Sequence, residues 1–270
     1  MRHWLSLALL ALIFSTAAQA QDTRVTRLDT LQQGRDWNAV GRLELGGTGF
    51  CTGALIAPNL VLTAAHCLFE KDSGAAIEPA KIEFLAGWRN GRASAYRWVR
   101  RVIVHPDYRL STDVSADKVR NDLALLELQR PIRDGSIFPF TTGHIPATGD
   151  RVGLVSYAKD RSEAPSLQDI CQVLSRQNGV LITSCSVDFG SSGAPIFAFR
   201  DGLPRIVSVV SAKADAEGQA VSLGTSLLQP LADLMAILAT QRGFFLKASP
   251  DPKARAIGSQ NNTGAKFVRP

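Results

Sequence analysis

The sequence predicts an all-β protein of two six-stranded antiparallel β-barrels followed by a C-terminal helix. Short runs rich in valine and leucine recur along the chain, and 22 glycines and 13 prolines separate them. Such runs bounded by turn residues indicate β-strands, while long amphipathic helical patterns are scarce. A chain of 270 residues that is 45% hydrophobic is also long enough to bury the cores of two such barrels.

The N-terminal segment differs from the rest of the chain. Arg2 gives it a positive start, residues 5–14 are apolar, and Ala18-Gln19-Ala20 offers small side chains for cleavage. This pattern is typical of a signal peptide over 1–20, and its apolar run is too short to favour a membrane anchor. We therefore expect a secreted or periplasmic protein, with no stable membrane insertion once the signal is removed. The polar residues 21–37 predict an N-terminal arm or a short propeptide.

The first barrel is expected over about 38–130. Turn residues such as Gly46-Gly47 and Pro58-Asn59 separate its apolar runs. Its six strands are predicted at 39–45, 50–57, 59–65, 82–88, 95–104 and 123–128. The polar stretch 109–120 predicts a loop that leads to the last of them.

The second barrel is expected over about 145–228, after a connection rich in proline and glycine. Its six strands are predicted at 151–158, 167–174, 180–185, 194–199, 205–210 and 220–225. Apolar residues at helical spacing then predict a helix over about 227–243, which completes a domain over 38–246. The composition of 247–270 predicts a disordered tail.

A glycine-flanked serine turn, Asp188-Phe189-Gly190-Ser191-Ser192-Gly193-Ala194-Pro195, leads into one of the apolar runs. Ser192 is the candidate nucleophile, although a serine hydroxyl needs a base and a third group that orients the base. His66 ends the segment Leu60-Val61-Leu62-Thr63-Ala64-Ala65-His66-Cys67, and Asp122 opens the segment Asn121-Asp122-Leu123-Ala124-Leu125-Leu126-Glu127-Leu128. An aspartate before a strand is commonly a turn residue, but here a nearly unbroken apolar strand follows it.

Together these three segments resemble the trypsin/chymotrypsin-like serine proteases, and among them the bacterial glutamyl-endopeptidase-like (V8-like) members. The chain order His, Asp, Ser separates this family from other folds with the same chemistry. The resemblance implies that His66 is the base, Asp122 its orienting group and Ser192 the nucleophile that forms an acyl-enzyme. It also implies that the backbone N–H groups of Gly190 and Ser192 form the oxyanion hole.

The serine turn departs from the family's pattern at two positions. Ser191 replaces an aspartate that pairs with a new N-terminus in many members, and Ala194 replaces a glycine. We therefore expect no salt-bridge activation switch.

The resemblance also suggests the substrate-binding residues. Ser186 is expected at the base of the primary pocket, and Ser208, Val209 and Val210 in the strand that pairs with the substrate backbone. In that register Ser208 would also support Asp122, and Val210 would narrow the pocket. We expect a small or medium uncharged side chain before the cleaved bond. A preference for glutamate is not expected, because Val207 replaces a histidine of the glutamate-specific relatives.

Four cysteines in an exported chain are expected to be bridged, and by themselves they allow three pairings. The resemblance implies that Cys51 bonds to Cys67 and, with it, that Cys171 bonds to Cys185. None of the cysteines forms a close Cys-x-x-Cys pair, so we expect no metal site and no cofactor.

We therefore predict an exported serine endopeptidase that acts on proteins or peptides as a monomer. The net charge of +6 is modest and spread along the chain, which does not favour nucleic-acid binding. His105 is interpreted as structural rather than catalytic. Two alternatives are a non-catalytic homologue whose barrels bind a partner, and an esterase of small acyl substrates. The presence of all three triad residues favours the protease over a binding module.

Overall fold

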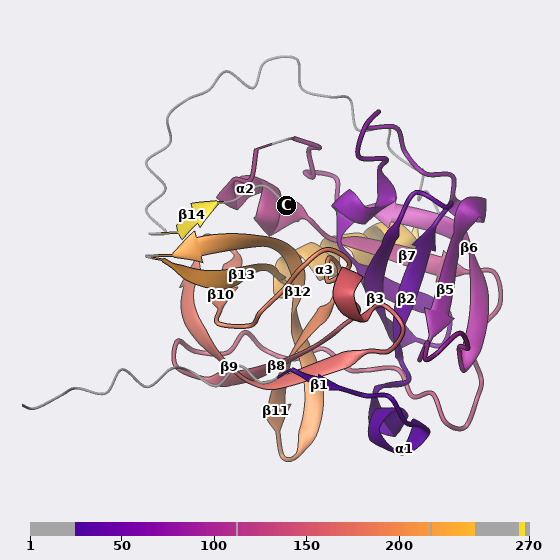
Figure 1. The fold of residues 1–270 in the computed structure, drawn as a ribbon. Coiled ribbons are helices and arrows are strands. Elements are labelled where there is room, and N and C mark those ends of the chain that lie inside the picture. Colours follow the sequence, from indigo (N-terminus) through magenta and orange to yellow (C-terminus); the bar gives the residue numbers. More distant parts are fainter. Residues whose placement is uncertain (1–24, 112, 217, 241–264, 268–270) are drawn as a thin grey trace, which may run out of the picture.

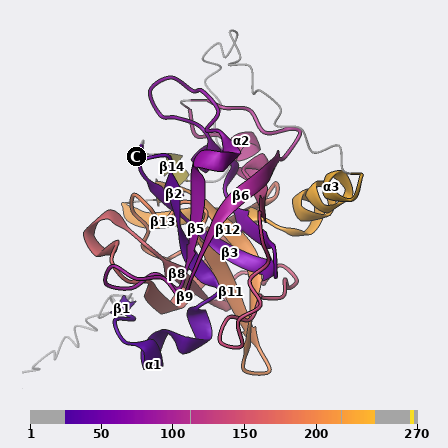
Figure 2. The same cartoon turned by 90° about the vertical axis from the view of Figure 1, so that its right-hand side faces the viewer.

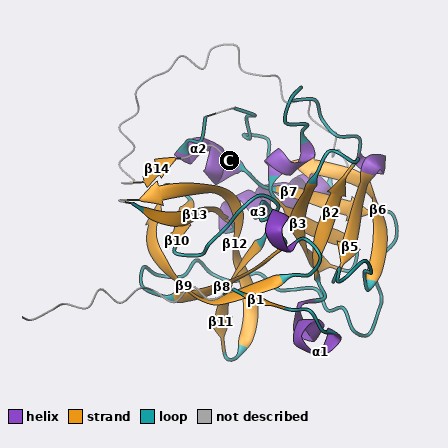
Figure 3. Cartoon of the chain, viewed as in Figure 1, coloured by secondary structure: helices purple, strands orange, loops and turns teal. Residues whose placement is uncertain are grey.

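The computed structural model describes residues 25–111, 113–216, 218–240 and 265–267. The signal peptide predicted over 1–20 and most of the tail predicted over 247–270 lie outside these ranges. Within them the chain forms two β-barrels that lie side by side, with few helices (Figures 1 and 3). The predicted fold class is confirmed.

The first barrel is closed, with strands in the order β2-β3-β4-β7-β6-β5. Its strands are β2 (Val40–Leu45), β3 (Phe50–Ala57), β4 (Leu60–Thr63), β5 (Ile82–Ala86), β6 (Ala95–Val104) and β7 (Ala124–Leu128). Leu43, Leu62 and Leu125 are fully buried in its core. All six strands overlap the predicted ones, because each barrel strand carries its own apolar run.

The second barrel follows the order β9-β10-β13-β12-β11-β8 and closes through the pairing of β8 with β9. Its strands are β8 (Arg151–Ser156), β9 (Ser166–Gln177), β10 (Val180–Thr183), β11 (Pro195–Arg200), β12 (Leu203–Ala216) and β13 (Gln219–Ser226). The β9–β10 hairpin turns at Asn178 and Gly179, both with positive φ. Two short strands extend the sheet: β1 (Thr26–Arg27) pairs with β9, and β14 (Ala265–Phe267) pairs with β12.

Three α-helices accompany the barrels in the described residues: α1 (Leu31–Gly34), α2 (Ala116–Asn121) and α3 (Leu228–Ala239). Single 3-10 turns cover Arg35–Trp37, Ala65–Leu68, Pro79–Lys81 and Lys159–Arg161. The C-terminal helix α3 was predicted. It lies at the margin of the molecule in Figure 2, where it packs against β6 and buries Leu234. No helix in the described ranges is long and apolar enough to cross a membrane.

One prediction about a polar segment is wrong. The loop predicted over 109–120 contains α2, whose N-cap Ser115 accepts a hydrogen bond from the Lys118 N–H. Within the tail predicted over 247–270, the structure describes only β14, whose backbone pairs with Ala214–Ala216. Neither element carries an apolar pattern, because α2 buries only Val119 and β14 is held by backbone pairing.

The N-terminal arm packs against both barrels from residue 26 onward. Arg89 of the first barrel is 6% exposed, and its guanidinium donates to the carbonyl oxygens of Leu28, Gly34 and Gly87 and to Asn38 Oδ1. A Cβ on Gly34 would lie 1.8 Å from Arg89 Nη2, so this approach requires glycine. Burial lowers the pKa of Arg89, yet a guanidinium stays charged in proteins. The arm is therefore held by a buried cation with neutral partners.

Three aromatic rings connect the arm, the segment between the barrels and the second barrel. The ring centroid of Phe197, on β11, lies 5.1 Å from that of Trp37 and 4.8 Å from that of Phe140. Both contacts are edge-to-face, the arrangement that aromatic pairs favour. These contacts pack the arm and the connecting segment against the second barrel.

Candidate active site

His66 and Asp122 come together on the first barrel. His66 lies on the 3-10 turn after β4, and Asp122 lies between α2 and β7. The His66 N–H donates to Asp122 Oδ1 over 2.8 Å, and His66 Nδ1 lies 2.6 Å from Asp122 Oδ2. Because a carboxylate only accepts hydrogen bonds, Nδ1 carries the proton and Nε2 keeps a free lone pair. The imidazole is therefore held in the form that accepts a proton at Nε2.

Asp122 is fully buried and ionised. Burial by itself would raise its pKa, but the charge and hydrogen bonds of His66 and a hydrogen bond from Ser211 together lower the pKa below the ordinary value. Ser211 Oγ donates to Asp122 Oδ2 over 2.5 Å, and it reaches across from β12 of the second barrel. A buried carboxylate with three hydrogen-bond contacts can stay charged at neutral pH. It can therefore stabilise an imidazolium on His66.

The expectation that Ser208 supports Asp122 is wrong. Ser208 Oγ donates to the Thr225 carbonyl oxygen instead, and Ser211 takes the predicted role. β12 contains a bulge between Val210 and Ala212 and continues to Ala216, six residues beyond its predicted end. Lys213 and Asp215 interrupt the apolar pattern there, because this part of β12 is only partly buried. Because of these two charged residues, the sequence pattern predicted that the strand ends at Val210.

The predicted substrate-binding residues of β12 differ in their neighbours from the residues that follow them. Val209 and Val210 are buried, and the Val210 carbonyl and N–H bond to Gly193 N–H and the Ala194 carbonyl. On the side of β12 away from β13, β11 pairs up to Val209 and β14 pairs from Ala214. Residues 211–213 therefore lack a strand neighbour on that side within the described residues. Ser186 is exposed, and its N–H donates to Gln168 Oε1.

Ser192 sits in a turn shaped by two glycines with positive φ, Gly190 (91°) and Gly193 (78°). A Cβ on Gly193 would lie 2.1 Å from Thr63 Oγ1 and 2.3 Å from the Thr52 carbonyl oxygen, so the turn presses closely on β3 and β4. The N–H groups of Gly190 and Ser192 donate to no acceptor in the described part of the chain. Two free N–H groups beside a serine hydroxyl can bind a negative oxygen.

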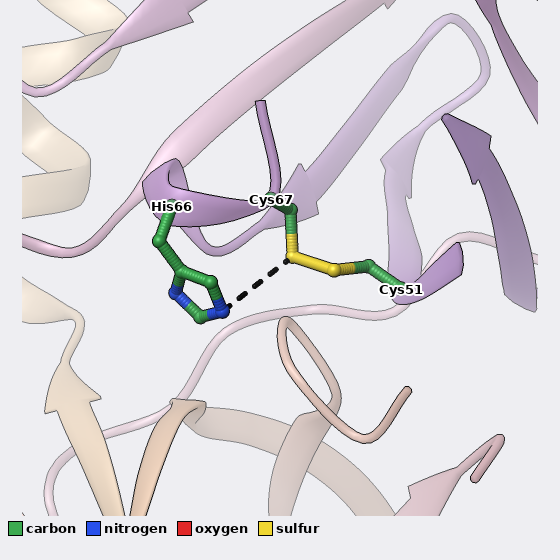
Figure 4. A group of neighbouring side chains, drawn as sticks. All are labelled: Cys51, His66 and Cys67. Atoms are coloured by element: carbon green, nitrogen blue, oxygen red, sulfur yellow. Dashed lines mark hydrogen bonds between the residues drawn. A yellow bond between two sulfur atoms is a disulfide. The ribbon is translucent and has the colours of Figure 1, made fainter. Parts of the chain in front are cut away.

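His66 Nε2 and Ser192 Oγ share no hydrogen bond within the described residues, and Nε2 lies 3.9 Å from Cys67 Sγ (Figure 4). Hydrogen bonds between a nucleophile and its base are often long without substrate and tighten in the complex. The serine turn nevertheless contacts the strands beside His66, since Thr52 N–H donates to the Ser192 carbonyl oxygen over 2.9 Å.

Both implied disulfides are present. The Cys51–Cys67 bond ties β3 to the turn that carries His66 (Figure 4). The Cys171–Cys185 bond ties β9 to the segment after β10. The sulfurs of Cys51 and Cys67 also cluster with His66, within 4.8 Å of one another. Because the two sulfurs are bonded together, this group offers a metal only the imidazole and does not fit a metal site.

Phe189, directly before Gly190, is flanked by two cations. Lys71 Nζ lies 4.7 Å from its ring centroid and Lys213 Nζ lies 5.4 Å from it. Lys213 also lies 3.2 Å from Asp188 Oδ1. A backbone hydrogen bond from Phe189, together with Lys213, lowers the pKa of Asp188 despite some desolvation. This cluster has no signature in the sequence, because Lys71 lies more than a hundred residues before Phe189.

His105 is 4% exposed, as expected for a structural residue. Its Nδ1 accepts a hydrogen bond from the Asp107 N–H, and its Nε2 lies 3.6 Å from Asp233 Oδ2 on α3. Burial lowers the pKa of His105 even though both aspartates oppose that effect. It makes no contact with the candidate triad and joins α3 to the first barrel.

A match to a protein-family model shows to which family the chain belongs. The model of the family described as Trypsin matches residues 30–223, which is most of the chain. The chain belongs to the trypsin family. Among solved structures, this trypsin-family chain is similar to a Glu endopeptidase in complex with MPD, with a TM-score of 0.65 at 18% identity. That match covers 82% of this chain and 98% of the other, and at this identity it shows the fold.

Curated relatives match over shorter stretches. Serine protease 56 of Mus musculus is 36% identical over 96 residues, which are 36% of this chain and 14% of that protein. Coagulation factor XII of Cavia porcellus is 40% identical over 90 residues, which are 33% of this chain and 14% of that protein. The matched region thus spans about a seventh of these much longer trypsin-family relatives.

Proposed function

We propose that this trypsin-family chain is an exported serine endopeptidase that hydrolyses peptide bonds through an acyl-enzyme. The observation that carries the proposal is the buried, ionised Asp122 with two hydrogen bonds to His66. This pair keeps Nε2 of His66 available as a base, and the serine turn carries two N–H groups without an acceptor.

In the proposed reaction, His66 Nε2 takes the proton of Ser192 Oγ as the oxygen attacks the substrate carbonyl carbon. The tetrahedral oxygen accepts hydrogen bonds from the N–H groups of Gly190 and Ser192. Protonated His66 then gives its proton to the leaving amine, and an acyl-enzyme remains on Ser192. A water molecule, deprotonated by His66, attacks the ester and releases the acid.

We place the substrate backbone along residues 211–213 of β12, the stretch between the β11 and β14 pairings. An extended peptide there adds a strand to the sheet edge. Ser186 carries no charge to attract a basic side chain, and Lys71 and Lys213 repel one. We propose that the residue before the cleaved bond is not lysine or arginine. The histidine of the glutamate-specific relatives is replaced by valine whichever serine supports Asp122, because valine precedes both Ser208 and Ser211. A preference for glutamate is therefore not supported.

The alternative is a non-catalytic homologue that uses the barrels to bind a partner. The missing Ser192–His66 hydrogen bond is the observation that favours it. An esterase of small acyl substrates would use the same groups.

The deciding experiment is labelling of the purified protein with a fluorophosphonate, with Ser192→Ala as the control. We expect one covalent label, on Ser192 by mass spectrometry, and cleavage of peptides as well as esters. A folded wild type that takes no label would instead support the binding module. N-terminal sequencing of the exported protein tests whether the signal peptide is removed after Ala20.

A further inference from the structure

Thr52 lies on β3 of the first barrel, yet its partners belong mostly to the second. It is fully buried and follows Cys51 of the disulfide. Its hydroxyl donates to the Gly190 carbonyl oxygen over 2.8 Å and accepts from the Tyr157 N–H over 3.1 Å. Its backbone N–H donates to the Ser192 carbonyl oxygen over 2.9 Å. One residue thus bonds to both residues that supply the oxyanion-binding N–H groups.

The position of Thr52 is itself fixed. Its carbonyl oxygen accepts a hydrogen bond of 2.9 Å from Thr63 Oγ1, at the end of the strand that leads to His66. The hydroxyl, the backbone N–H and the carbonyl oxygen of Thr52 therefore all form hydrogen bonds. Thr52 is therefore a rigid support and connects the His66 side of the site to the serine turn.

The serine turn needs such a support. Gly190 has a φ of 91°, and glycine tolerates many backbone conformations, so the peptide groups on either side of it can rotate at little cost. Within the turn, Ser191 Oγ lies 3.3 Å from Ser156 Oγ and 3.4 Å from the Tyr157 carbonyl oxygen, which are long hydrogen bonds. The Thr52 hydroxyl makes the shortest side-chain hydrogen bond to this turn.

We propose that Thr52 is a positioning residue that holds the oxyanion-binding N–H groups of Gly190 and Ser192 from the opposite barrel. The inference rests on the proposed protease function. By fixing the carbonyl oxygens of Gly190 and Ser192, Thr52 restrains the two peptide groups that flank the Ser192 N–H. The first of these groups is also joined through the Gly190 Cα to the peptide that carries the Gly190 N–H. The two N–H groups then converge on one point before substrate arrives, which is the preorganisation that stabilises a developing oxyanion.

The test compares the wild type with Thr52→Val, which keeps the branched shape and removes the hydroxyl, and Thr52→Ser, which keeps the hydroxyl. We expect Thr52→Val to lower kcat by about 10-fold to 100-fold, below the effect of losing a whole oxyanion donor. KM should change by less than about twofold, because substrate binding along β12 is untouched. Thr52→Ser should restore most of kcat. A peptide aldehyde, which forms a tetrahedral adduct, should bind Thr52→Val more weakly in proportion to kcat, while a product peptide should bind equally well.

Thr183→Val is the matched control, because Thr183 is also fully buried on a strand, and its hydroxyl bonds to Ser222 Oγ and the Cys185 N–H, which lie outside the turn 188–195. Both valine variants should lose stability, but only Thr52→Val should lose kcat. Equal losses of kcat in both, or an unchanged kcat in Thr52→Val, would overturn the proposal. If Thr52→Val does not fold, Thr52→Ala takes its place.

A readout without substrate separates this inference from the proposed function. Amide hydrogen exchange followed by mass spectrometry should speed up in a peptide covering 188–194 in Thr52→Val but not in Thr183→Val. A wild type that takes no fluorophosphonate label and cleaves no peptide would refute the proposed protease function. The exchange experiment would still test whether Thr52 holds the serine turn. If the wild type is active and exchange is unchanged in Thr52→Val, the positioning role of Thr52 is refuted and the proposed protease function stands.

Discussion

Ser211 and Asp122 lie on different barrels and share a hydrogen bond of 2.5 Å. The carboxylate that orients His66 is thus held partly by the barrel that carries Ser192. The imidazole of His66 is therefore oriented correctly only when the two barrels are packed together correctly.

Replacing Ser211 by alanine should lower kcat/KM by about tenfold, because a hydrogen bond to a charged group contributes about 1.5 kcal/mol. The loss should appear mainly in kcat, measured with a peptide substrate at neutral pH. Ser208→Ala is the control, since Ser208 is also buried but its hydroxyl bonds to the Thr225 carbonyl oxygen. An equal loss of kcat in both variants would show that Ser211 acts only through stability.

Asp122 should make the stability of the protein depend on pH. Its pKa is lower in the folded protein than the ordinary value of 3.8. Its contribution is therefore complete above that value and is lost as the pH falls through the folded-state pKa. Urea unfolding at a series of pH values should show a steeper loss of stability below about pH 5 for the wild type than for Asp122→Asn. Parallel curves for the two proteins would contradict a depressed pKa.

Lys213 should disfavour basic side chains in the substrate. Lys213→Met removes one of the two cations beside Phe189 and should raise cleavage after lysine or arginine relative to uncharged residues. Since Lys213 is partly exposed and paired with Asp188, the gain should be about fivefold. A peptide library read by mass spectrometry measures the ratio. Lys81→Met, on an exposed 3-10 turn, should leave it unchanged, and the same shift there would point to net charge.

Arg89 should be among the strongest stabilising side chains of the N-terminal arm. Arg89→Met leaves the buried carbonyl oxygens of Leu28 and Gly34 without their donor, and the free energy of unfolding should fall by about 3 kcal/mol. Arg92→Met, three residues away and exposed, should change it little. Denaturant unfolding of the two variants checks this, and a small loss for Arg89→Met would mean that water replaces the guanidinium.

The architecture could be predicted because each barrel strand is a short apolar run between turn residues. All twelve barrel strands overlap the predictions. The pairing of His66 with Asp122 was implied by family resemblance, and the structure shows the contact.

The features that were missed depend on contacts between distant residues. Ser208 and Ser211 are both serines that follow valine, and only the bulge after Val210 determines which one reaches Asp122. Thr52 has no motif of its own, because its role depends on a turn 138 residues away. The helix α2 buries one residue, so it leaves no periodic signal.

The buried guanidinium of Arg89 also bears on how the chain matures. A cut within the arm after Gly34 would remove the segment that contains two of the four acceptors of a cation that cannot shed its proton. The guanidinium would then keep only Asn38 Oδ1 and the Gly87 carbonyl oxygen as acceptors. We therefore expect any processing site in the N-terminal region to lie before Leu28, so that the arm stays with the barrels throughout the life of the protein.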